Sequence, residues 1–425
     1  MSTVVDLLDD LKWRGLFAQS TDEKALRESL KKPITLYIGF DPTAPSLHVG
    51  NLVVLLALRR FQLAGHNPIA LVGGATGLIG DPSGKNEERS LNTTDVVAEW
   101  VGRIKGQVSK FLDFDAPKNP AIVANNLDWT SPLSAIEFLR DVGKHFSVNQ
   151  MLAKDSVASR LEAGGISYTE FSYQVLQSFD FLELYRRNNC TLQLGGSDQW
   201  GNIVGGLDLI RRVEGGSGHA LTIPLLAKAD GTKFGKTAGG SIWLDPQMTS
   251  PYAFFQYWLN TDDKDVINFL KVFSFKSREE IESIEKLHNE NPGAREAHRE
   301  LARELTSLVH SVEICERVEA AARALFGQGE LNELDEATLS SALAELPRTT
   351  VSKKEEIPSW VDLLAATGVV DSKSAARRIV KEGGAYLNNV KVTAEDFALS
   401  KSDFLCGKYA ILRKGKRDLA AVELI

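Results

Sequence analysis

The sequence has 425 residues, of which 43% are hydrophobic, and a formal net charge of −7. A chain of this size and composition can bury more than one hydrophobic core, so we expect two or three domains. It contains no run of about 18 apolar residues, and its first residues lack the layout of a signal peptide. These features predict a soluble, cytoplasmic protein with no membrane partner. Three widely spaced cysteines outside any CxxC motif also argue against disulfides and structural zinc.

The charge is unevenly distributed along the chain. From Lys353 onward there are 13 Lys and Arg against 10 Asp and Glu, so the tail is basic and the remainder is acidic. A basic tail on an acidic body points weakly to a polyanionic partner. On charge alone, an ordinary solvated surface is the favoured explanation of the tail.

The first half of the sequence alternates short apolar runs with helical patterns. We expect strands at 34–40, 68–75, 120–126, 191–196 and 220–226, and helices at 49–65, 93–112, 169–188 and 197–213. Continuous apolar strands separated by helices are typical of a parallel sheet with both faces covered. The predicted fold class is therefore α/β, with a Rossmann-like doubly wound parallel sheet.

The second half changes character twice. A helical, highly charged region is followed by a polar, turn-rich stretch with a short helix, and then by a compact basic unit of helices and strands. The last unit is predicted to be a small C-terminal α+β domain. The expected regions are the sheet domain at 1–230, a loop and connector at 231–250, a helical domain at 251–330, a linker at 331–357 and the C-terminal domain at 358–425.

The segment GFDPTAPSLHVGN, residues 39–51, lies where the first predicted strand gives way to a helix. In open α/β sheets, ligands collect at the carboxyl ends of strands, and helix N-termini favour anions. Gly50 would let a phosphate approach the backbone, while Thr43 and His48 would donate hydrogen bonds to it. His48 could instead simply satisfy the start of the helix.

A second glycine-rich segment, GGATGLIGDPSGK at 73–85, follows the next strand. It matches neither the GxGxxG pattern nor the spacing of a P-loop. Asp81 is placed to hold a ligand ammonium, and Lys85 and Arg89 are candidate phosphate partners. A simple turn with solvated charges remains the alternative for these two basic residues.

Two further patterns have ligand-binding chemistry. The segment LLAKADGTKFGKT at 225–237 carries Lys233 and Lys236 on a glycine-rich loop that can fold over a polyphosphate, although such loops are often only exposed turns. In the helix predicted at 169–188, Tyr173, Gln177 and Asp180 share one face because they lie at positions i, i+4 and i+7. That face could line a partly dry pocket or could meet water.

Taken in order, YIGFDPTAPSLHVGN, ALVGGATGLIGDPSGK, YQVLQSFDF, GGSDQWGNI and KFGKT resemble the motifs of class I aminoacyl-tRNA synthetases, and in detail those of bacterial tyrosyl-tRNA synthetases. HVGN corresponds to the HxGH-type signature and KFGKT to the KMSKS-type loop. The similarity covers essentially the whole chain. It departs from the family pattern at Asn51, which replaces the second histidine and cannot carry charge, and at Ile38, where some relatives have a thiol.

The resemblance implies specific roles. Residues implied to act on the phosphates during catalysis are Thr43, His48, Lys233, Lys236 and Thr237. Residues implied to bind tyrosine are Tyr37 and Asp180 at the phenol, and Asp81, Tyr173, Gln177 and Gln199 at the other end. Residues implied to bind ATP are Asp41, Gly50, Asn51, Lys85, Arg89, Gly196 and Asp198. In the basic tail, implied to bind tRNA, the candidate contacts are Arg377, Arg378 and Lys381, with Arg413, Lys414, Lys416 and Arg417 as a second cluster.

The implied activity is the ligation of tyrosine to tRNA, with ATP as a substrate that brings its own Mg²⁺ and no dedicated metal site on the protein. The segment 131–157 resembles the family's homodimer interface, although by sequence it could equally be a core helix pair. Two alternatives stay open. A nucleotidyltransferase of the same fold would share HVGN, and a non-catalytic RNA-binding descendant would keep the basic tail.

Overall fold

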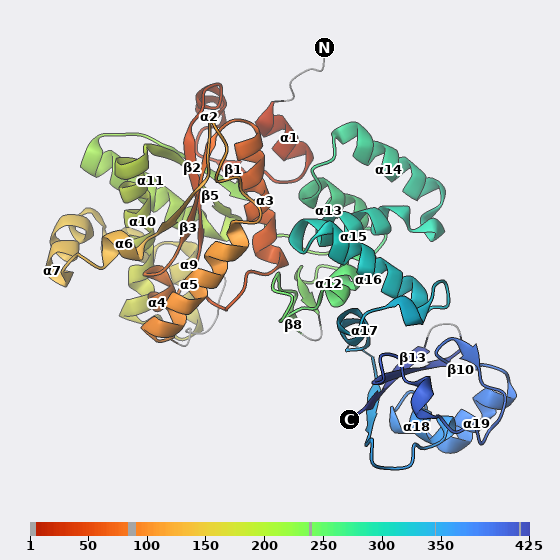
Figure 1. The fold of residues 1–425 in the computed structure, drawn as a ribbon. Coiled ribbons are helices and arrows are strands. Elements are labelled where there is room, and N and C mark those ends of the chain that lie inside the picture. Colours follow the sequence, from red (N-terminus) through yellow and green to blue (C-terminus); the bar gives the residue numbers. More distant parts are fainter. Residues whose placement is uncertain (1–5, 84–90, 238–239, 345, 416–417) are drawn as a thin grey trace. The chain divides into compact units, whose positions relative to one another are not determined.

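The computed structural model describes residues 6–83, 91–237, 240–344, 346–415 and 418–425 (Figure 1). The chain forms two compact units. One comprises Met1–Asp245 with Asp262–Ala297, and the other comprises Pro246–Thr261 with His298–Ile425. Among the described residues, no helix combines the length and apolar character that crossing a bilayer requires.

The first unit is built on a six-stranded sheet with the order β1-β6-β5-β2-β3-β4. Its strands are β1 (Gln19–Ser20), β2 (Thr35–Phe40), β3 (Asn67–Val72), β4 (Ile122–Asn125), β5 (Cys190–Gly196) and β6 (His219–Ile223). The pairs from β2 to β6 are parallel, as predicted, whereas the short edge strand β1 runs antiparallel to β6 and was not predicted. The predicted fold class is confirmed.

Four long helices cover this sheet. They are α3 (Val49–Leu63), α5 (Thr94–Val108), α10 (Tyr168–Asn188) and α11 (Trp200–Glu214). Figure 1 shows α10 and α11 on one side of the strands and α3 and α5 on the other. Each was predicted within a few residues, except that 197–199 forms a 3₁₀ turn before α11 begins.

The order of the strands reverses at β2, because the chain moves from β2 through β3 to β4 in one direction and later places β5 and β6 on the other side. Such a reversal leaves a crevice at the carboxyl ends of the strands, since the connections on either side diverge. The segment after β2 and the end of β5 therefore face the same crevice.

Shorter elements complete the first unit. They are α1 (Leu7–Trp13), α2 (Glu23–Ser29), α4 (Thr76–Ile79), α6 (Leu127–Thr130), α7 (Ala135–Glu137), α8 (Val148–Leu152), α9 (Asp155–Ala163), β7 (Lys236–Thr237), β8 (Gly240–Ser241), α13 (Val266–Phe273) and α14 (Arg278–Glu290).

The end of α13 is held by two buried arginines. Arg14 donates to the carbonyl oxygens of Lys271 and Ser274 at 3.0 Å each, and Arg60, from α3, also donates to Ser274. Cations stabilise the carboxyl end of a helix, so α13 is tied to α1 and α3.

The second unit contains a helical part and a separate sheet. The helices are α12 (Pro251–Leu259), α15 (Glu296–Val309), α16 (Val312–Leu325) and α17 (Glu336–Leu343), with α15 beginning in the first unit. The C-terminal sheet has the order β11-β10-β12-β13-β9, and its strands are β9 (Arg348–Val351), β10 (Ala385–Leu387), β11 (Val390–Lys391), β12 (Tyr409–Lys414) and β13 (Asp418–Leu424).

The C-terminal sheet has its own hydrophobic core. Two helices, α18 (Trp360–Ala366) and α19 (Lys373–Lys381), contribute Trp360, Leu364 and Val380 to it, and these pack with Leu412 and Val422 of the sheet. The small α+β domain predicted for the basic tail is therefore present. Strand β9 pairs in parallel with β13, so this sheet takes in residues from the stretch expected to be a linker.

Candidate active site

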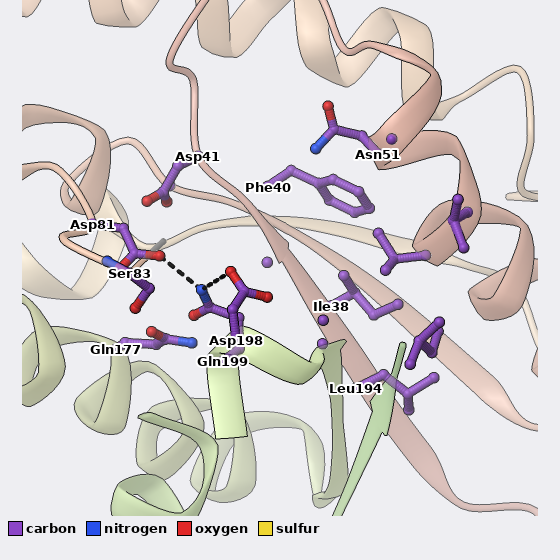
Figure 2. A pocket seen from close by; sticks show the side chains of 18 of the residues that line it. Ile38, Phe40, Asp41, Asn51, Asp81, Ser83, Gln177, Leu194, Asp198 and Gln199 are labelled. Carbon is purple, nitrogen blue, oxygen red and sulfur yellow. Dashed lines mark hydrogen bonds between the residues drawn. The ribbon is translucent and has the colours of Figure 1, made fainter. Parts of the chain in front are cut away.

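A pocket of about 500 Å³ lies at the carboxyl ends of β2 and β5 (Figure 2). It brings together segments that are far apart in the sequence. The predicted residues that line it are Tyr37, Asp41, Thr43, His48, Gly50, Asn51, Asp81, Tyr173, Gln177, Asp180, Gly196, Asp198, Gln199 and Lys233. Lys236 lies in β7, where it is exposed and not part of the lining. Lys85 and Arg89 fall outside the described residues, as does the side chain of Thr237.

One end of the pocket contains a buried phenol and a buried carboxylate. The hydroxyl of Tyr37 is inaccessible to solvent and has no hydrogen-bond partner among the described residues. Asp180, on α10, accepts hydrogen bonds from Nδ2 of Asn126 and Nε1 of Trp129, at 2.9 Å each. Burial raises the pKa of Asp180 to about 7, although these two hydrogen bonds oppose the shift. Burial also raises the pKa of Tyr37, and the charge of Asp180 adds to this, so the phenol stays neutral.

Asn126 and Trp129, the two hydrogen-bond donors to Asp180, were not predicted from the sequence. A signal for Asn126 existed, because it is a polar residue that directly follows a strand of the parallel sheet. Trp129 offered no signal, since a tryptophan in a short helix predicts only a residue of the hydrophobic core. Both are more than nine-tenths buried.

The opposite side of the crevice gathers carboxylates. Asp81 accepts hydrogen bonds from Nε2 of Gln199 at 2.8 Å and from the backbone N–H of Ser83 at 2.9 Å. Figure 2 shows Asp41, Asp81, Gln177, Asp198 and Gln199 around a common space. Burial raises the pKa of Asp198, and the nearby charge of Asp81 contributes to this. Several carboxylates in one crevice favour a cationic group such as an ammonium.

His48 has the structural role considered from its sequence, and its role toward phosphate stays a prediction. It is the N-cap of α3, where its Nδ1 accepts from the backbone N–H groups of Gly50 at 3.0 Å and Asn51 at 3.3 Å. Asn51 completes a capping box by accepting from the backbone N–H of His48 at 3.1 Å. With Nδ1 accepting, a neutral ring carries its proton on Nε2 and can donate it. Gly50 is required here, because a Cβ would lie 2.7 Å from Cε1 of His48.

The lysine loop is fixed at one point by an aromatic side chain. Phe234 is buried, and its ring centroid lies 5.0 Å from that of Phe269 and 5.4 Å from that of Phe273, both on α13. The neighbouring Lys233 lines the pocket but is exposed. The loop therefore presents an ammonium group at the crevice while it is anchored from behind.

Comparisons with known proteins agree with this geometry. The family model described as "tRNA synthetases class I (W and Y)" matches residues 28–327, and the "Tyrosine--tRNA ligase SYY-like C-terminal domain" matches residues 338–422. The tyrosine–tRNA ligase of Streptomyces avermitilis is 62% identical over 424 residues, 99% of each chain. That of Mycobacterium bovis is 58% identical over 423 residues, again 99% of each chain.

The chain belongs to the tyrosine–tRNA ligase family of class I. The resemblance predicted from the motifs, and with it the class of enzyme, is confirmed. Among solved structures, a C-terminally truncated mitochondrial tyrosyl-tRNA synthetase from Aspergillus nidulans superimposes with a TM-score of 0.68 at 29% identity, covering 76% of this chain and 95% of that one.

The basic candidates of this ligase lie on its C-terminal domain. Arg377 and Arg378 on α19 are exposed, and Lys381 is exposed with an ion pair to Glu395 at 3.2 Å. The second cluster differs, because Arg413 stacks on the ring of Tyr386 at 4.0 Å from its centroid. Lys416 and Arg417 lie outside the described residues.

The raised pKa of Asp180 predicts how tyrosine binding depends on pH. The motif resemblance assigns Asp180 to the substrate phenol, and we adopt this assignment as a proposal. A phenol hydroxyl donates more strongly to an ionised carboxylate than to a neutral one, so on this proposal tight binding requires the ionised form. With a pKa of about 7 in the empty pocket, tyrosine affinity should fall as pH drops through 7, by roughly tenfold between pH 8 and pH 6. Calorimetric titration of tyrosine across this range measures the change, and Asp180→Asn serves as the control with a flat profile. A wild-type affinity that rises toward pH 6 would contradict the assignment.

Proposed function

We propose that this ligase activates L-tyrosine with ATP to form tyrosyl-adenylate, releases pyrophosphate and transfers tyrosine to the 3′ end of tRNA in the cytoplasm. The observation that carries the proposal is one crevice with a buried phenol–carboxylate pair at one end and His48 with Lys233 elsewhere on its wall. Tyrosine-dependent exchange of pyrophosphate into ATP tests the first step, transfer to tRNA tests the second, and cell fractionation tests the location.

Recognition of tyrosine follows from unpaired buried groups. The substrate hydroxyl would supply the partner that Tyr37 lacks, and would donate to Asp180. Phenylalanine would leave both groups desolvated and unpaired, which costs more than the lost hydrogen bond itself. At the other end, Asp81, Tyr173 and Gln177 would hold the substrate ammonium. Tyr37 and Asp180, the two groups that phenylalanine would leave unpaired, would therefore determine which amino acid is accepted.

Activation needs positioning and charge stabilisation. The tyrosine carboxylate is ionised at neutral pH and needs no general base. Its oxygen forms a bond to the α-phosphorus of ATP while the bond from that phosphorus to the pyrophosphate oxygen breaks. Charge builds up on the departing pyrophosphate, where Thr43, His48 and the loop lysines would stabilise it.

ATP would lie along Asp41, Gly50, Asn51, Gly196 and Asp198, with its ribose near the carboxylates and its phosphates near the N-terminus of α3. Mg²⁺ prefers oxygen ligands and keeps several of its waters. In the crevice, Asp41 and Asp81 already accept hydrogen bonds from neighbouring groups. We therefore assign the ion to the ATP phosphates, as part of the substrate.

A homodimer is the assembly that the surface supports. The segment 131–157 exposes large apolar side chains, with Ile136 at 72%, Leu139 at 52% and Val148 at 58% of their accessible surface. Large apolar side chains that are exposed close together mark association surfaces. A second copy of the chain would cover them.

Charged side chains at this surface should dissociate the dimer. Ile136→Asp combined with Leu139→Asp would place two carboxylates in the apolar contact, so the mass in sedimentation equilibrium should fall from two chains to one at micromolar concentration. Leu63→Asp is the matched control, because Leu63 is 62% exposed on α3, outside this segment. A monomeric wild type would refute the proposed dimer.

Removing the phosphate contacts should slow activation and spare tyrosine binding. His48 and Lys233 would act mainly as charge develops, so His48→Ala and Lys233→Ala should each lower the rate of adenylate formation by roughly 100-fold or more. The affinity for tyrosine should change less than about twofold. Stopped-flow measurement of adenylate formation, with Lys228→Ala as a control in the same loop region, distinguishes the two effects. Loss of tyrosine binding with a normal rate would overturn the assignment.

The C-terminal domain should be needed for tRNA alone. A chain ended at Leu346 keeps α17 and removes the whole C-terminal sheet, so it should still catalyse pyrophosphate exchange but charge tRNA poorly. In the full chain, Arg377→Glu with Arg378→Glu should raise the KM for tRNA and reduce its salt dependence by roughly one unit of slope per lost phosphate contact. Equal loss of exchange and charging on truncation would show that the domain is structural. Exchange with no tRNA-dependent transfer by the full chain would favour a nucleotidyltransferase.

A further inference from the structure

The floor of the crevice contains a continuous chain of hydrogen bonds that the sequence motifs left unexplained. Oδ2 of Asp41 accepts from the hydroxyl of Tyr173 at 2.7 Å, and Oδ1 accepts from the hydroxyl of Thr76 at 2.6 Å. The same Thr76 oxygen accepts from Nδ2 of Asn126 at 2.9 Å, and this nitrogen also donates to Asp180 at 2.9 Å. The chain thus runs from Tyr173 to Asp180 through three side chains.

The direction of each hydrogen bond in the chain is fixed. Oδ1 of Asn126 accepts from the backbone N–H of Ala75 at 2.7 Å, so the amide is fully used and its Nδ2 must donate to both Thr76 and Asp180. Thr76 therefore has only its own hydrogen left to donate, and it donates to Asp41. Thr76 is 2% exposed and Asn126 is 1% exposed, so water cannot readily replace either bond.

The glycine-rich segment 73–77 makes room for this chain. A Cβ at Gly73 would lie 2.0 Å from Oδ1 of Asp41 and 2.3 Å from Oγ1 of Thr76. Any larger residue would occupy the place of that hydrogen bond. This packing requirement explains the first glycine of the GGATG pattern, which fits neither a P-loop nor a dinucleotide motif.

We propose that Thr76 and Asn126 are positioning residues that couple the tyrosine and ATP subsites. The inference rests on the proposed function, because tyrosine would engage Asp180 at one end of the chain and Tyr173 at the other, while Asp41 would face ATP. Binding at Asp180 polarises Asn126, and the effect passes through the Thr76 hydroxyl to the carboxylate of Asp41. Coupling between two sites is reciprocal, so ATP must favour tyrosine by the same factor.

Replacing Thr76 tests the coupling directly. Thr76→Val keeps the shape and removes the hydroxyl, whereas Thr76→Ser keeps the hydroxyl. Calorimetry gives the Kd of tyrosine with and without saturating α,β-methylene ATP, which cannot react, and the ratio is the coupling factor. We expect a wild-type factor of at least about fivefold, a smaller factor in Thr76→Val, where only the direct hydrogen bond from Tyr173 to Asp41 remains, and a restored factor in Thr76→Ser. Thr222→Val is the control, because Thr222 is also fully buried but lies on β6 outside the chain.

Either of two results would overturn the proposal: a wild-type factor of one, or a Thr76→Val factor equal to the wild type. Wild-type pyrophosphate exchange is measured in parallel. A wild-type enzyme without exchange activity refutes the proposed function. An active wild-type enzyme whose coupling factor is unchanged by Thr76→Val refutes only the coupling. If Thr76→Val does not fold, NMR on the wild type replaces it. The indole N–H of Trp129 donates to Asp180, so its resonance reports on that carboxylate, and the resonance is assigned by its loss in Trp129→Phe. The nucleotide analogue alone should shift this resonance, and an unchanged signal would overturn the proposal.

Discussion

The buried carboxylate of Asp180 is the constraint on which the rest of the crevice depends. An ionisable group that is 3% exposed requires hydrogen-bond partners, because desolvation of its charge is otherwise too costly. Two of these partners come from Asn126 and Trp129, which fixes where the chain after β4 must pass. The substrate would supply another. The pocket is therefore incomplete without a hydroxyl at this point, and that incompleteness is a source of specificity.

At His48 the observed structural role and the proposed catalytic role involve the same ring. Its Nδ1 caps α3, so the ring orientation is set by the same hydrogen bonds that begin the helix. The ring lies at the end of the helix where the dipole favours an anion. The capping role is observed, and the geometry is compatible with the predicted phosphate contact. A residue whose orientation is fixed by capping loses little entropy when it engages a phosphate.

Much of this arrangement could be predicted from the sequence, for reasons that differ between elements. Tyr173, Gln177 and Asp180 follow the helical period, so their common face was predictable from local geometry alone. Asn126 and Trp129 reach Asp180 only through the tertiary path of the chain, which no local pattern encodes. Strand β1 is two residues long, and β9 pairs with a strand distant in sequence, so both depend on contacts that sequence periodicity does not reveal.

The chain after the lysine loop and the HVGN segment are linked through backbone hydrogen bonds. After the loop, the N–H of Leu244 donates to the carbonyl oxygen of Leu47 at 2.9 Å, and the N–H of Val49 donates to that of Ile242 at 3.0 Å. These bonds place the returning chain directly beside the N-cap of α3.

The loop also packs closely against α3. Gly235 has a φ of 76°, and a Cβ there would lie 2.8 Å from Cγ2 of Val49, so only glycine fits this turn and this approach. Phe234, between the rings of α13, fixes the opposite side. Since Arg60 ties the end of α13 to α3, the helix that begins at His48 also anchors the helix that holds the loop. Lys233, beside Phe234, and His48, the N-cap of α3, are thus supported by the same pair of packed helices.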